Sequence, residues 1–251
     1  MTQRLPRPFP YYRAMPESTT PAEPETAQER TESGRLDNFV DGAFAFAITL
    51  LVISGASLPK DVAALEQALR GVPAFAACFA ELAWFWHGHV RWRDSVGLTD
   101  RRSLLLSLLL VFFALIFVFP LHIVFSQAFN SMSDGVLSPG MTSVASGSAN
   151  GTAILFVSFG LSFACMAGTL AALYAHGIRT VASRARTEFV SARIGRVTWT
   201  YVAAVSLLSV LLALSLPSSL SGLAGFCYFL FAATHLVAKR YRKHLEATSP
   251  S

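Results

Sequence analysis

The sequence predicts an all-α polytopic membrane protein with six transmembrane helices in each subunit. Hydrophobic residues make up 53% of the 251 residues and charged residues only 14%, whereas a soluble domain usually carries about 25% charged residues. The mean hydropathy is +0.48. The basic residues behind the net charge of +5 form short clusters between long apolar runs, and this arrangement argues against a nucleic-acid partner.

Six apolar runs define the expected helices, because a helix needs about 20 mostly apolar residues to cross a bilayer. They cover roughly residues 39–58, 72–90, 103–126, 152–175, 197–216 and 221–238. The third run is the most continuous, since no charge interrupts it from Ser103 to Phe119. The second contains Glu81, His87 and His89. The last two are close enough in sequence to form an antiparallel hairpin.

The segments around these runs set the expected domain boundaries. Residues 1–34 contain no apolar core of a signal peptide and mix Pro, Glu, Thr and Arg, so we expect a flexible cytoplasmic tail. Residues 35–243 form the six-helix transmembrane domain, and residues 244–251 a short cytoplasmic tail. The Ser- and Gly-rich stretch at about 127–151 is expected to be an external connection.

Basic residues predict the orientation of the bundle. They cluster between the second and third runs, between the fourth and fifth, and after the sixth, whereas the other side carries only Lys60 and Arg70. The positive-inside rule then places both termini in the cytoplasm, which requires an even number of spans. We expect a multi-pass protein of the plasma membrane.

The first run contains small residues and one hydroxyl among large apolar side chains. Phe46, Thr49, Leu50 and Ile53 share one helix face. By periodicity alone this face is ordinary helix packing, with Thr49 bonded back to its own helix. Asp41 projects about 140° away from Phe46, and an ionisable group in a membrane helix is usually paired or functional.

Other chemistry-bearing residues leave two interpretations open. Glu81 and His89 lie on nearly the same side of the second run and could form a proton-linked pair. The alternative, which the sequence favours, is a buried hydrogen-bonded network that reaches Asp41. The cysteines lack a CxxC partner, and no HExxH, nucleotide loop or nucleophile elbow is present. We therefore expect no catalytic residue, metal site or cofactor, and no enzyme activity.

The first run also carries a family resemblance. The stretch R-L-D-N-F-V-D-G-A-F-A-F-A-I-T-L-L-V-I resembles the opening helix of the transmembrane protein 175 family of potassium-permeable channels, whose motif is R-x-x-x-F-S-D. Arg35, Phe39 and Asp41 match it, and Val40 replaces the serine. The second run ends in Trp86-His-Gly-His89, similar to the Trp-x-x-His motif of the family. Ser107 stands where the family often has an asparagine.

The resemblance implies a homotetramer whose first helices line a central potassium pore in the lipid bilayer. Carried over by position, Phe46, Leu50 and Ile53 form the apolar constriction and Thr49 a ring that selects among monovalent cations. A structural network is implied for the remaining motif residues. These are Arg35, Phe39, Asp41, Trp86 and His89.

At one position of the first run this chain departs from the family. The family usually has Ile or Leu where this chain has Phe46, and four phenyl rings are bulkier. The alternative function is a proton-coupled secondary transporter that uses Glu81, His89 and Asp41, although no inverted repeat supports it. A membrane enzyme or scaffold has only the histidine cluster in its favour.

Overall fold

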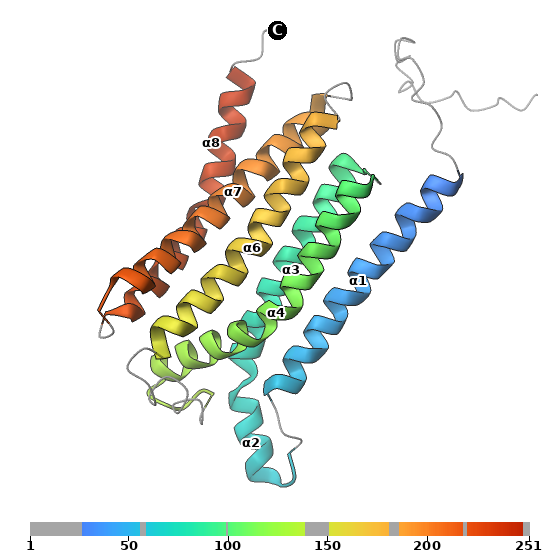
Figure 1. Ribbon diagram of the computed structural model, residues 1–251. Coiled ribbons are helices and arrows are strands. Elements are labelled where there is room, and N and C mark those ends of the chain that lie inside the picture. Colours follow the sequence, from blue (N-terminus) through green and yellow to red (C-terminus); the bar gives the residue numbers. More distant parts are fainter. Residues whose placement is uncertain are drawn as a thin grey trace, which may run out of the picture.

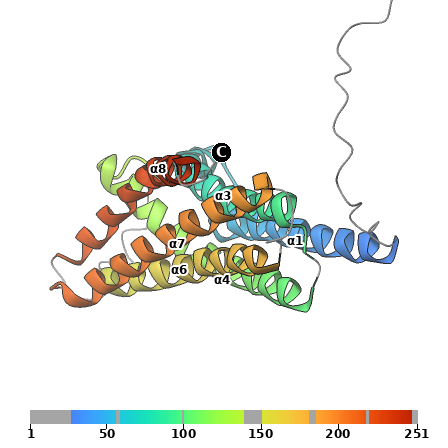
Figure 2. The ribbon, with the colours of Figure 1, turned by 90° about the horizontal axis from the view of Figure 1, so that it is seen from above.

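The computed structural model describes residues 27–55, 59–98, 100–138, 151–180, 186–217 and 220–247. Within this part of the chain every regular element is a helix: seven α-helices and one 3₁₀ helix. The long helices run side by side in a bundle (Figure 1). Seen from above, α1 lies at one edge of it (Figure 2). The all-α prediction is confirmed for the described residues.

Helix α1 spans Ala27–Gly55 and therefore begins before the expected domain boundary at residue 35. It contacts α3 and α4. The second expected span is longer and bent: α2, Val62–Arg70, meets α3, Val72–Val96, at 44°. The Asp61 side chain starts α2 by accepting a hydrogen bond from the backbone N–H of Ala64 at 2.7 Å, as helix N-caps do.

Three further long helices match the middle of the expected pattern. Helix α4 spans Arg101–Met132, α6 spans Gly151–Thr180 and α7 spans Arg186–Ser215. Asp100 caps α4, where its carboxylate accepts hydrogen bonds from the Ser103 hydroxyl and the Arg102 N–H. Helix α4 continues beyond residue 126, so the first residues of the expected external connection are helical.

The last expected span differs most from the prediction. Residues 221–238 do not form one α-helix, because Ser221–Ala233 is the 3₁₀ helix η1 and α8 covers Thr234–Ala247. Four of the described helices are long and apolar enough to cross a membrane, and the bent pair α2–α3 would make a fifth. The count of six spans is therefore not confirmed.

The core is rich in aromatic rings, and glycines let its helices approach closely. Phe85 stacks on Trp199 at a centroid distance of 5.2 Å and meets Phe163 at 4.8 Å. Gly88 of α3 faces Trp199 of α7, and Gly195 of α7 faces Tyr174 of α6. Small residues let helices approach closely, which drives association in lipid, where the hydrophobic effect is weak.

The basic helix ends gather at one end of the bundle. Helix α1 begins at this end and α8 finishes there, together with the ends of α3 and α6 and the start of α4 (Figure 1). Arg93, Arg101, Arg102 and Arg179 belong to these helix ends. We call this the basic end of the molecule.

Candidate pore-lining helix and its contacts

Helix α1 has two different faces. One face is buried against the bundle, with exposed fractions of 3% or less at Val40, Phe44, Ala47 and Leu51. These residues recur at intervals of three or four, as an α-helix that packs along one side requires. This face joins α1 to the hydrophobic core.

The opposite face has no neighbour within the described chain. Phe46 is 55% and Ile53 67% exposed, and Thr49 is exposed between them. A Cβ added at Gly42, on the same face, would meet no atom within 4 Å. Leu50 is half-buried and packs against the core, so it lies at the margin of this face.

The composition of the exposed α1 face differs from that of a lipid-facing helix. Between residues 104 and 119 of α4, every exposed residue is bulky and apolar. They are Leu104, Leu105, Leu108, Leu109, Phe112, Ile116 and Phe119. The α1 face instead intersperses Gly42, Ala45 and Thr49 among its large residues. Small residues and hydroxyls mark helix–helix interfaces in membranes.

The hydroxyl of Thr49 has a defined orientation. It donates to the Ala45 carbonyl of the preceding turn at 3.0 Å. The hydrogen bond to the same helix that periodicity favoured is therefore present. A hydroxyl has one proton and two acceptor lone pairs, so this bond leaves oxygen lone pairs available on the exposed face.

Two residues of the Trp-x-x-His motif hold helices together. The indole N–H of Trp86 donates to Asp41 Oδ1 at 2.8 Å and joins α3 to α1. His89 is 2% exposed and its Nε2 lies 3.0 Å from the Ser107 hydroxyl of α4. Trp86 and His89 are three residues apart and therefore lie on the same side of α3, from which they contact α1 and α4 respectively.

An ion pair that the sequence reasoning missed lies near these contacts. Arg93 Nη2 donates to Asp37 Oδ2 at 3.0 Å, and Arg93 Nε lies 2.6 Å from Oδ1. Arg93 also donates to the Leu98 carbonyl at 2.7 Å. Asp37 lies within the first-helix motif, but a separation of 56 residues from Arg93 gave no signal that the two meet. The exposed Arg35 and Phe39 take no part in these described contacts.

Glu81 and His89 face different surroundings. Glu81 lines a pocket beside α7, together with His87, whereas His89 packs toward α4 and does not line this pocket. Glu81 Oε2 is buried and has no hydrogen-bond partner among the described residues. The described contacts therefore do not join Glu81, His89 and Asp41 into one relay.

Outside the expected spans, one carboxyl has a shifted pKa. Burial alone would raise the pKa of Asp100, but the hydrogen bonds that its carboxylate accepts from the Ser103 hydroxyl and from His176 Nε2, 2.8 Å away, together hold that pKa below the ordinary value. Among the described residues, no group of three or more His, Cys, Asp or Glu side chains could hold a metal ion.

Comparisons with known proteins agree with the motif. The family model described as endosomal/lysosomal potassium channel TMEM175 matches residues 35–120. A potassium channel of Marivirga tractuosa is 27% identical over 214 residues, which cover 82% of this chain and 86% of that protein. The resemblance seen in the first helix is therefore confirmed, and these relatives are channels and not enzymes.

A solved structure extends the likeness to the fold. The crystal structure of a threonine-to-alanine variant of the potassium channel MtTMEM175, in complex with a nanobody–MBP fusion protein, matches with a TM-score of 0.71 and 25% identity. The match covers 84% of this chain and 93% of the channel. The helical bundle is thus similar to that channel well beyond residues 35–120.

Proposed function

We propose that this chain, a relative of the TMEM175 potassium channels, forms a homotetrameric potassium-permeable channel whose pore is lined by α1. The observation that carries the proposal is the exposed α1 face, on which no other described helix covers Phe46, Thr49 and Ile53. Four copies around an axis would bury this face. They would also place one side chain of each kind in a ring.

The rings have complementary chemical roles. Phe46 and Ile53 form apolar constrictions, which gate by excluding water and need no charge. Leu50 contributes from the margin of the same face. Between them, the Thr49 oxygens replace part of the water shell of a cation, as rings of oxygen dipoles do in other filters. The hydrogen bond to Ala45 supports this role because it orients the hydroxyl proton away from the axis.

Contacts behind the pore helix fix its rotation. A turn of about 100° separates successive residues, so rotating α1 by the angle of a single residue would already move the pore face away from the axis. The Trp86–Asp41 hydrogen bond and the Arg93–Asp37 ion pair connect α1 to α3 on the side toward the basic end. We place that end, and both termini, in the cytoplasm of a cell with the channel in its plasma membrane.

Potassium flux from liposomes that contain the full-length protein tests the proposal. Phe46→Ala should increase flux, because it widens the narrowest apolar ring. Phe112→Ala on α4 is the matched control, since Phe112 is equally exposed at 55% but belongs to the bulky apolar face. Thr49→Ala should lower the preference for potassium over sodium, and Thr49→Ser, which keeps the hydroxyl, should retain it.

Several outcomes would contradict the channel. Equal effects of Phe46→Ala and Phe112→Ala would show that the α1 face does not line the path. If the functional particle had the mass of one subunit, a tetrameric pore would be excluded. Strict proton coupling that Glu81→Gln abolishes would favour the transporter instead.

A further inference from the structure

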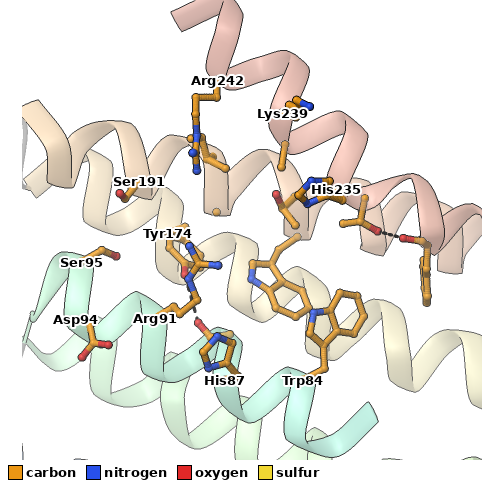
Figure 3. Close-up of a pocket in the computed structure, with 18 of the residues that line it drawn as sticks. Trp84, His87, Arg91, Asp94, Ser95, Tyr174, Ser191, His235, Lys239 and Arg242 are labelled. Carbon is orange, nitrogen blue, oxygen red and sulfur yellow. Dashed lines mark hydrogen bonds between the residues drawn. The ribbon is translucent and has the colours of Figure 1, made fainter. Parts of the chain in front are cut away.

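The pocket beside Glu81 is a site that the proposed pore does not use. It has a volume of about 1120 Å³ and is lined by residues of α3, α6, α7, η1 and α8. Figure 3 shows side chains from α3, α6, α7 and α8 around it. We call it the α3–α8 pocket. His87 and His235 on its lining are exposed, so the pocket opens to the outside of the bundle.

One end of the α3–α8 pocket is basic. Arg91 of α3 and both Lys239 and Arg242 of α8 line it (Figure 3). Lys239 and Arg242 are three residues apart and share one face of α8. Asp94 is the acidic residue at this end, so three fixed positive charges face one negative charge.

The other end is aromatic. Trp84 lies 5.0 Å from Trp199 and 5.9 Å from Phe231 between ring centroids, and all three residues line the pocket. Trp84 precedes Arg91 by seven residues, about 10 Å along a helix. Glu81 is a further turn away from Arg91, so its carboxylate does not oppose a ligand at the basic end.

We propose that the α3–α8 pocket binds an anionic phospholipid, with its phosphate at the basic end and its glycerol and upper acyl carbons along the aromatic rings. Basic pockets between membrane helices on the cytoplasmic side recruit anionic head groups, and tryptophan rings favour the boundary between head groups and hydrocarbon. A free phosphate compound shares the basic contacts but has no use for the aromatic end. This inference goes beyond the proposed channel, because it assigns a ligand to a surface away from α1.

Native mass spectrometry of the full-length protein in detergent, titrated with phosphatidylglycerol, tests this site without measuring flux. Each basic contact should be worth roughly fivefold in affinity. The double variant Lys239→Gln/Arg242→Gln should therefore raise the dissociation constant roughly thirtyfold. Arg240→Gln/Lys243→Gln is the matched control, because it removes the same charge from exposed positions of α8 that do not line the pocket. This control pair should leave binding within about threefold of wild type, well under the roughly fivefold effect of one contact.

Three results would overturn the assignment. If the two double variants weakened phosphatidylglycerol binding equally, binding would follow the total charge of α8. Equal retention of phosphatidylcholine would mean that the head-group charge plays no part. Displacement of phosphatidylglycerol by millimolar inorganic phosphate would assign the pocket to a free phosphate compound. Thermal unfolding of each variant checks that the bundle is intact. The test does not depend on potassium flux, so its result is separate from that of the channel proposal.

Discussion

Replacing Gly88 by alanine should destabilise the bundle, although alanine is the better helix former. A Cβ at this position would lie 2.2 Å from Cζ2 and 2.9 Å from Cε2 of Trp199. The indole cannot move aside freely, because it stacks on Phe85 at 5.2 Å and packs against Trp84 at 5.0 Å. Either the indole or the α3–α7 contact must shift.

The expected size of this effect follows from two opposing terms. Overpacking in a well-packed core costs about 1–3 kcal/mol, and a rigid indole places this site at the upper end. Alanine offsets about 1 kcal/mol of that through helix propensity. The net loss is about 2 kcal/mol, which corresponds to a fall in Tm of roughly 4–8 °C for a chain of this size. Circular dichroism of the purified protein during heating measures it.

Two controls distinguish the clash from a general intolerance of substitution. Gly168→Ala on α6 adds a Cβ that meets no atom within 4 Å, so its Tm should stay the same or rise. In a Trp199→Leu background the indole is absent, and Gly88→Ala should then cost far less, because neighbouring substitutions couple. An undiminished loss in that background, or a Gly88→Ala protein as stable as wild type, would refute the reasoning.

Three further substitutions probe the polar contacts by thermal unfolding. Asp37→Asn should cost about 1–3 kcal/mol, because Arg93, 9% exposed, loses its carboxylate partner; a stability equal to wild type would contradict this ion pair. Trp86→Phe should cost about 1 kcal/mol by removing the donor to Asp41, and it should add little once Asp41→Asn is present. The pKa of Asp100 is lowered in the folded state, so its contribution is complete above its unfolded pKa of about 3.9 and is lost as the pH falls through the folded pKa. Asp100→Asn should therefore lower Tm at neutral pH and converge with wild type in acid, and a constant difference at every pH would refute this.

Much of the fold could be predicted because hydropathy acts over whole segments. The apolar runs that begin near residues 103, 152 and 197 correspond to α4, α6 and α7. A run of this length in lipid must form a helix, because its backbone N–H and C=O groups can then bond to one another. Residues 221–238 were harder, because apolar composition does not distinguish an α-helix from the 3₁₀ geometry of η1. The short helix α2 depends on its Asp61 cap and was missed.

The candidate site also has features that the sequence predicted and features that it did not. The first-helix motif pointed to the residues of α1 and to the related channels, and the structure adds a hydrogen bond between Trp86 and Asp41. The Asp37–Arg93 pair and the Gly88–Trp199 contact were not predicted. Each joins residues far apart in sequence, and no local pattern encodes such a meeting.

The sequence by itself determined that this chain is a helical membrane protein whose first helix resembles that of a potassium channel family. Only the tertiary structure decided which side of that helix is left open, and that Glu81 and His89 face different neighbours. The physical reason is helix rotation. Composition indicates that a segment is a helix in lipid, but it does not indicate the direction of each side chain, which turns by about 100° from one residue to the next. Which polar groups meet therefore depends on how every helix packs against the others.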